Sequence, residues 1–189
     1  MKRVYFAPLR RLLEAVVLIA VLPGLSVAQN GPIVSHVAGN PGGPGVADGQ
    51  GTAARFNSPS GMWSDGQSLY IADRGNHTIR RMDIATRSVT TITGTPGIAG
   101  NLDGPLNSAQ FQSPSAVWGD GSKLYVAGGS SVRIVDLARG VLTTVPGLQV
   151  REAIGIWGTT DYLYVLEPGF SGFRQPSQPG SILLLHRGT

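Results

Sequence analysis

The sequence contains no cysteine, and several other residue types are scarce. Without cysteine, neither a disulfide framework nor a lipid anchor on a cysteine is available. Charged residues make up only 14% of the chain, which is too little for a solvated, disordered polypeptide. Hydrophobic residues reach 41%, so the 189 residues are able to bury a core, as one domain.

Acidic residues are nearly absent from the N-terminal part, where Glu14 is the only one before Asp48. Residues 1–28 hold four of the 15 basic side chains and one of the 11 acidic ones, which leaves 11 basic and 10 acidic groups in the remainder. The high isoelectric point therefore belongs mostly to the first residues. Without a basic surface, nucleic-acid binding is excluded.

The N-terminus has the order of a secretory signal. Basic residues are followed by the apolar run Ala15–Leu22, by Pro23, and by the small residues of Ser26–Ala28. This order predicts a signal peptide over residues 1–28 and a mature chain over 29–189, located in the periplasm or outside the cell. The run is too short for a transmembrane helix of about 20 residues, so no membrane span is expected after cleavage. An uncleaved anchor or a buried helix is the alternative.

The rest of the chain repeats itself. Residues 33–73 align with residues 88–128 without a gap, and 18 of these 41 positions are identical. A weaker third copy follows 39 residues after the second, without the long glycine- and proline-rich loop. Self-similarity at a fixed period is typical of stacked repeat architectures. The repeats are placed at about 33–87, 88–140 and 141–189.

Each full copy is predicted to form four short antiparallel strands. In the first copy these strands are Gly61–Trp63, Ser68–Ala72, Thr78–Ile84 and Ser88–Thr93. The second of them is an almost continuous apolar run, which indicates burial on both faces. Four-stranded sheets covered on both faces by their neighbours are the blades of a β-propeller, so the fold is predicted to be all-β.

One tryptophan recurs at the same place in each copy, as Trp63, Trp118 and Trp157. A residue repeated in this way suits the core or the packing between blades. We therefore do not expect these rings to form a platform for stacking sugars.

The first copy resembles the NHL repeat. Its strand Leu69–Asp73 and its hairpin Asn76–Arg80 are similar to the aliphatic-Tyr-hydrophobic-Ala-Asp strand and the Asn-His-x-Ile-Arg hairpin of that family. The segment Val37–Phe56 resembles the long inter-blade loop of exported bacterial members. The second copy departs from the pattern at Gly128–Ser131, and the third keeps only its Trp and Tyr framework. The resemblance implies a β-propeller of the NHL type.

The sequence holds about three blades, whereas propellers close with about 4–8, and members of this family typically with about six. The predicted strand Pro32–Val37 aligns with the fourth strand of a blade, and Ser181–Leu185 corresponds to a third strand that no fourth strand follows. Three interpretations stay open. The chain is a non-functional truncated fragment of a longer NHL protein, a homodimer that completes a six-bladed ring, or an open stack of blades.

Because strands alternate in direction, the loops entering each blade and the hairpins between second and third strands emerge on one side. Loops on a rigid scaffold commonly carry binding residues. The candidates on this side are Asp48, Asp103, Phe170 and Arg174, and above all Asp73, Arg74, Asn76 and His77, which are the binding residues that we predict. Asp73 also suits a cap of its hairpin, and His77 suits packing against the neighbouring loop.

An enzyme is the alternative function, because propellers related to this family include lyases and lactonases. Their sites need metal ligands on the innermost strands, but His36, His77 and His186 are the only histidines and none lies on a predicted first strand. Gly-x-Ser-x-Gly is absent as well. We predict no catalytic residues, no metal and no cofactor. The predicted function is an exported scaffold that binds an unidentified protein or carbohydrate.

Overall fold

The computed structural model describes residues 34–148, 150–169 and 180–187. The predicted signal peptide, over residues 1–28, lies outside them. Regular structure in the described ranges consists of β-strands and two short 3₁₀ turns, η1 (Gly51–Ala53) and η2 (Arg74–Asn76). The prediction of an all-β fold is confirmed.

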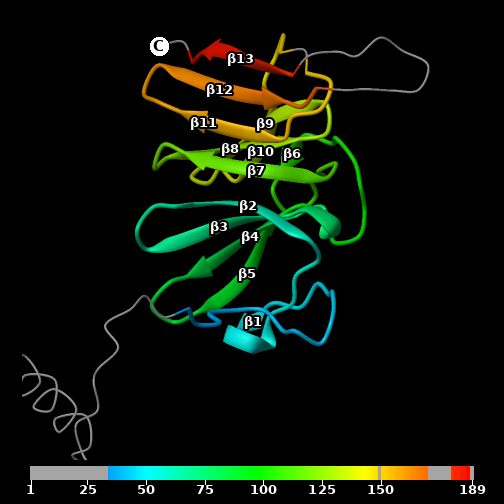
Figure 1. Cartoon of the computed structure of the whole chain (residues 1–189), viewed down its shortest axis with the longest axis vertical. Helices are drawn as coiled ribbons and strands as arrows, with labels where there is room; N and C mark the ends of the chain where they lie inside the picture. Colours follow the sequence, from blue (N-terminus) through cyan, green and yellow to red (C-terminus); the bar gives the residue numbers. More distant parts are fainter. Residues whose placement is uncertain (1–33, 149, 170–179, 188–189) are drawn as a thin grey trace, which may run out of the picture. The chain divides into compact units, whose positions relative to one another are not determined.

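The first sheet, blade 1, has five antiparallel strands in the order β1-β5-β4-β3-β2 (Figure 1). They are β1 (Gly49–Gln50), β2 (Pro59–Ser64), β3 (Ser68–Asp73), β4 (Thr78–Asp83) and β5 (Ser88–Thr93). The four longer strands are the predicted ones. The fifth, β1, pairs with the outer edge of β5 and was not among the predicted strands.

The second sheet, blade 2, repeats this order as β6-β10-β9-β8-β7. Its strands are β6 (Gly104–Pro105), β7 (Pro114–Gly119), β8 (Lys123–Gly128), β9 (Ser131–Asp136) and β10 (Val141–Thr144). The third sheet, blade 3, has the order β11-β12-β13 in the described residues. Its strands are β11 (Gly155–Gly158), β12 (Tyr162–Glu167) and β13 (Ser181–His186).

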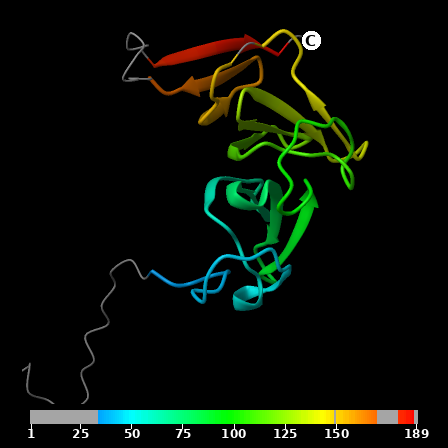
Figure 2. The same cartoon turned by 90° about the vertical axis from the view of Figure 1, so that its right-hand side faces the viewer.

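The blades pack face to face in the order of the sequence, through contacts of β2 with β7 and of β7 with β11 (Figures 1 and 2). Tyr70 and Ala72 of blade 1 share a buried cluster with Val117 and Val126 of blade 2. A second cluster joins blade 2 to blade 3. Strand β3, which lies between β2 and β4, is buried on both faces, as its apolar run predicted.

Each of the first two tryptophans packs on a glycine of the next blade. A Cβ atom on Gly119 would come within 2.5 Å of Trp63 Cζ3, and a Cβ atom on Gly158 within 2.8 Å of Trp118 Cζ3. Each tryptophan also lies beside the tyrosine opposite it on the neighbouring strand, as Trp63 does beside Tyr70. The prediction of inter-blade packing is confirmed for these two, whereas Trp157 is exposed.

The predicted outer strand Pro32–Val37 is not formed where the structure describes it, since residues 34–37 belong to no strand. A strand needs a neighbouring edge to pair with. The outer edge of blade 1 is already occupied by β1, so this chain offers residues 34–37 no partner there.

Candidate binding face

Loops from neighbouring strands meet at one side of the blades, as the strand order predicted. The backbone N–H of Gly75, in η2, donates to the carbonyl of Asn57, in the loop before β2, at 2.8 Å. The N–H of Ala153, before β11, donates to the carbonyl of Gly129 in the β8–β9 hairpin at 2.8 Å. The predicted binding residues Asp73, Arg74, Asn76 and His77 all belong to this side.

Asp73 is fully buried at the end of β3. Its carboxylate accepts hydrogen bonds from the backbone N–H of Asn57 at 2.8 Å, from Asn76 Nδ2 at 2.8 Å and from Arg80 Nη1 at 2.9 Å. A buried charge costs free energy unless it is paired and hydrogen-bonded, and here it is both. The network therefore fixes the η2 hairpin to the loop before β2, and Asp73 and Asn76 are engaged within it.

Asp48 and Asp103 anchor the two long loops to buried arginines. Asp48 Oδ1 accepts from Arg80 Nη2 at 2.7 Å, and Asp103 accepts from the equivalent guanidinium of Arg133. The guanidinium carbons lie over rings of the same loops, 5.1 and 5.4 Å from the centroids of Phe56 and Phe111. These carboxylates hold the loops in place on their blades.

His77 follows η2 in the left-handed conformation, with φ 59°. Its Nδ1 accepts a hydrogen bond from the backbone N–H of Ser113 at 3.1 Å. Because Ser113 enters blade 2, this bond joins the hairpin of blade 1 to the loop of the next blade. The prediction that His77 packs against the neighbouring loop is confirmed.

Arg74 is the predicted residue whose side chain reaches a pocket. The pocket has a volume of about 240 Å³ and receives residues from four different loops. Its walls are formed by Arg74, Gln112, Ser113, Ser115, Gly129, Arg151, Glu152, Ala153 and Ile154. Arg74 Nη2 lies 3.9 Å from Glu152 Oε1, and both side chains are about half exposed, at 51% and 55%. Because both side chains are half exposed, their charges are accessible to a ligand. An exposed ion pair of this kind contributes at most about 1 kcal/mol to stability, so a ligand can replace it at little cost.

The segment that carries Arg151 and Glu152 is held by Glu167 at the end of β12. The backbone N–H of Arg151 donates to Glu167 Oε1 at 2.6 Å, and the Ser181 hydroxyl donates to Oε2 at 2.8 Å. The bond from Arg151, followed by that from Ser181, lowers the pKa of Glu167 below its usual 4.5. The carboxylate stays ionised at neutral pH and fixes this wall of the pocket.

The sequence analysis did not select Arg151, Glu152 or Gln112. A signal was present, because all three lie in segments that enter a blade, on the side where a ligand was expected. The third copy is too degenerate for motif comparison, so its Arg-Glu pair did not stand out.

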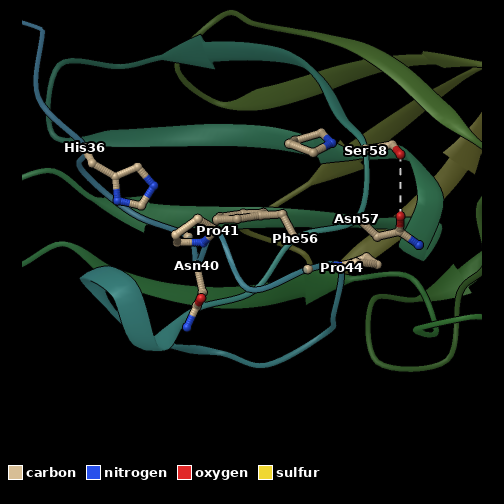
Figure 3. A pocket seen from close by; sticks show the side chains of 10 residues that line it. His36, Asn40, Pro41, Pro44, Phe56, Asn57 and Ser58 are labelled. Carbon is tan, nitrogen blue, oxygen red and sulfur yellow. Dashed lines mark hydrogen bonds between the residues drawn. The ribbon is translucent and has the colours of Figure 1, made fainter.

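A second pocket, of about 450 Å³, lies along the loop that leads into blade 1 (Figure 3). Figure 3 shows Phe56 and Pro41 beside the polar side chains of Asn40 and Asn57. The polar atoms are used locally, since Asn40 Oδ1 accepts from the Gly42 N–H at 2.7 Å. No arginine, lysine or acidic residue is among the described residues that line it.

Two predicted candidates, Phe170 and Arg174, lie outside the described residues. Within the described ranges, no three His, Asp or Glu side chains gather as metal ligands would. Nor does any helix in this part of the chain have the length and apolar character needed to cross a bilayer.

No protein-family model matches the sequence. The chain is 33% identical over 112 residues to Protein SUPPRESSOR OF QUENCHING 1, chloroplastic, of Arabidopsis thaliana, covering 57% of this chain and 10% of that protein. It is 28% identical over 133 residues to NHL repeat-containing protein 2 of Bos taurus, covering 64% and 18%. With the Gallus gallus protein of that name, the identity is 41% over 70 residues, covering 37% and 9%. The chain thus spans less than a fifth of these relatives.

Two solved structures from Bacteroides are similar to the chain. An auxiliary nutrient binding protein from Bacteroides ovatus shares 18% identity with a TM-score of 0.49, over 60% of this chain and 36% of that one. A protein of unknown function from Bacteroides thetaiotaomicron shares 22% identity with a TM-score of 0.49, over 76% and 36%. Identities this low do not extend to function.

The names of the NHL repeat-containing relatives agree with a feature that the first blade displays in its own residues. That feature is the strand ending in Asp73 and the hairpin that leads to Arg80, which the structure joins by a buried ion pair. Together, this motif and the relatives named for NHL repeats support an NHL-type β-propeller, of which the described residues form three blades.

Proposed function

We propose that the chain is an exported binding scaffold, and that the pocket between Arg74 and Glu152 takes an anionic group of its ligand. The observation that carries the proposal is the accessible ion pair between loops of two blades, in a pocket of about 240 Å³. Three charged side chains, Arg74, Arg151 and Glu152, line the pocket and give it a net positive charge.

The support for this site is physical. Its walls come from segments held by hydrogen bonds to neighbouring blades, so little ordering is needed when a ligand binds, and preorganisation favours affinity. Arginine binds carboxylates through charge-assisted hydrogen bonds in a fixed geometry. Gln112 and Ser113 add an amide and a hydroxyl for neutral polar groups.

The other predictions about partners remain proposals of the same kind. A protein and a carbohydrate both supply carboxylates, and export rests on the N-terminal signal alone. The six-bladed homodimer concerns the ends of the blade stack rather than this pocket.

Calorimetric titration with defined probes tests the proposal. The acidic probes are a galacturonate oligosaccharide and a polyglutamate peptide, and the neutral controls are a cellulose oligosaccharide and a polyglutamine peptide. We expect one of the acidic probes to bind and its neutral counterpart to fail. Arg74→Ala should weaken binding about tenfold, because one charge-assisted contact is lost. Glu152→Gln should strengthen binding, since it frees Arg74 from its internal partner.

Arg139→Ala is the matched control. Its side chain is highly exposed and pairs only weakly with Asp136, at 3.9 Å, in the turn between β9 and β10. That turn emerges on the side opposite the pocket, so binding should not change. Equal binding of acidic and neutral probes, or full affinity in Arg74→Ala, would exclude this pocket as the anion site.

A further inference from the structure

The junctions between blades follow one pattern. In blades 1 and 2, the strand after the long loop (β2 or β7) carries a tryptophan one residue before its end. The ring lies on the last glycine of the corresponding strand of the next blade, as Trp63 does on Gly119. The C-terminal ends of β5 and β10 pack into the same junctions. Ile92 of β5 lies between blades 1 and 2, and Val145, directly after β10, lies between blades 2 and 3. A junction therefore needs a tryptophan face, an opposing apolar face and the end of an outer strand.

Among the described residues, no blade packs against the tryptophan face of blade 3. Trp157 is 59% exposed and Ile182 is 70% exposed, whereas Ile79 and Val132, which correspond to Ile182 in register, are at most 1% exposed. Leu166 and Leu184 are exposed beside them. An apolar groove of about 250 Å³ runs over this face.

Blade 1 presents the complementary half. Met62 is 66% exposed on the face turned away from blade 2, beside the partly or fully buried Leu69, Ile71 and Met82. A third pocket, of about 210 Å³, lies on this face, and Val37 is one of the residues that line it. Position 37 corresponds to Ile92 in the 55-residue repeat. Val37 therefore lies on blade 1 in the same way as Ile92, at the end of β5, lies on blade 2.

We propose that the two faces bind each other in a second copy of the chain, blade 3 of one copy on blade 1 of the other. A two-fold arrangement makes both junctions equivalent and covers both exposed apolar faces at once. It continues the junction that the chain already forms twice within itself. The partner is therefore this chain itself, and its contact is independent of the proposed anion pocket.

The same arrangement supplies the strand that is not formed in the single chain. Among the described residues, no strand pairs with the outer edge of β13. In blade 1 the equivalent edge pairs as Arg80↔Thr91, Arg81↔Thr90 and Met82↔Val89. Transferred through the repeat, this register pairs Leu183, Leu184 and Leu185 of one copy with His36, Ser35 and Val34 of the other.

One residue departs from the pattern. Ser64 of blade 1 stands where blades 2 and 3 have Gly119 and Gly158. In the proposed dimer, the Cβ of Ser64 therefore meets the ring of Trp157 from the other copy. The ring must tilt to accommodate it, which makes this junction weaker than the internal ones. The association is consequently concentration-dependent, and Ser64→Gly should tighten it.

Cysteine cross-linking tests the register, because the native chain has no cysteine. Residues directly opposite each other in an antiparallel pair have the Cα separation that a disulfide requires. The double variant Ser35→Cys/Leu184→Cys should form a covalent dimer on mild oxidation. Ser35→Cys/Leu185→Cys is the control, since a shift by one residue turns the side chain to the other face. Equal cross-linking of both, or of neither, overturns the strand exchange.

Sedimentation of the mature chain from low to high micromolar concentration tests the face itself. We expect a monomer–dimer equilibrium that Trp157→Asp weakens at least tenfold and Ser64→Gly tightens, whereas Ile98→Asp, in an exposed loop, leaves it unchanged. A monomer at all concentrations overturns the proposal. A second result also overturns it. If Ser64→Gly leaves the dimer unchanged and Trp157→Cys forms a disulfide between the two copies, the two blade 3 faces contact each other instead of blade 1.

Discussion

Arg187, directly after β13, pairs with Asp120 in the turn between β7 and β8 and so ties blade 3 to blade 2. Its guanidinium also lies over the rings of Trp118 and Tyr125, 5.3 and 4.8 Å from their centroids. Nη2 donates to the Tyr125 hydroxyl at 2.8 Å. The tryptophan that packs on blade 3 is thus covered by a residue of blade 3.

Asp120 makes this contact sensitive to acid. Burial, the largest influence, would raise the pKa of Asp120, but hydrogen bonds from Lys123 and Ser122, together with the charge of Arg187, lower it from 3.8 to about 2. A carboxyl whose pKa is lowered by folding stabilises the protein above its unfolded pKa and loses that effect as the pH falls through the folded value.

We therefore expect stability to decrease between about pH 4 and about pH 2, and Asp120→Asn to flatten this dependence. At pH 7 the variant should be less stable than the native chain. Urea unfolding followed by tryptophan fluorescence at a series of pH values measures both effects. An unchanged slope in the variant would show that the pair with Arg187 does not persist in solution.

The tryptophans at the internal junctions should matter more for stability than the histidine of the NHL hairpin. Truncation of a packed tryptophan to alanine costs about 3–5 kcal/mol, so Trp63→Ala and Trp118→Ala should both lower the melting temperature strongly. His77→Ala removes one hydrogen bond, from the Ser113 N–H, worth about 1 kcal/mol. Thermal unfolding of the three variants decides this, and equal losses would mean that the rings are not packed in solution.

The blades were predictable because their signals are local and repeated. The apolar run Ser68–Ala72 and the β-branched segment Ser88–Thr93 each specify a strand without reference to the rest of the chain. The short strand β1 was not predictable, because Gly49 and Gln50 carry no strand preference and pair only when the loop is folded back. Its anchor is the long-range contact of Asp48 with Arg80, which the spacing of the two residues does not reveal.

The candidate site was predictable only as a face. The alternation of strands places the loops on one side, and that much follows from the sequence. Which side chains line a pocket depends on distances between blades, as for Arg74 and Glu152, which are far apart in the chain and meet through packing.

Export should remove residues 1–28. The motive is the order of basic, apolar and small residues that ends at Ala28. Intact-mass measurement of the protein from an exporting bacterial host should give a chain that begins at Gln29. A full-length soluble protein in the cytoplasm would refute both the signal and the exported location.

Arg80 and Arg133 occupy equivalent positions and provide a matched pair of variants. Both are buried, but Arg80 neutralises the buried Asp73, whereas blade 2 has Gly128 in place of that aspartate. The acidic partner of Arg133, Asp103, is about half exposed and can be hydrated when the guanidinium is removed. Blade 3 has Leu183 at this position, so leucine fits the backbone of such a strand.

Arg80→Leu should therefore destabilise the chain by about 3–5 kcal/mol, because it leaves the charge of Asp73 buried without an oppositely charged partner. Arg133→Leu should cost only about 1–2 kcal/mol, from lost hydrogen bonds to the carbonyls of Gln110 and Leu102. The double variant Asp73→Gly/Arg80→Leu should be more stable than Arg80→Leu alone, since no buried charge remains. Urea unfolding of all three gives the energies, and similar losses for the two single variants would show that Asp73 is not the source of the difference.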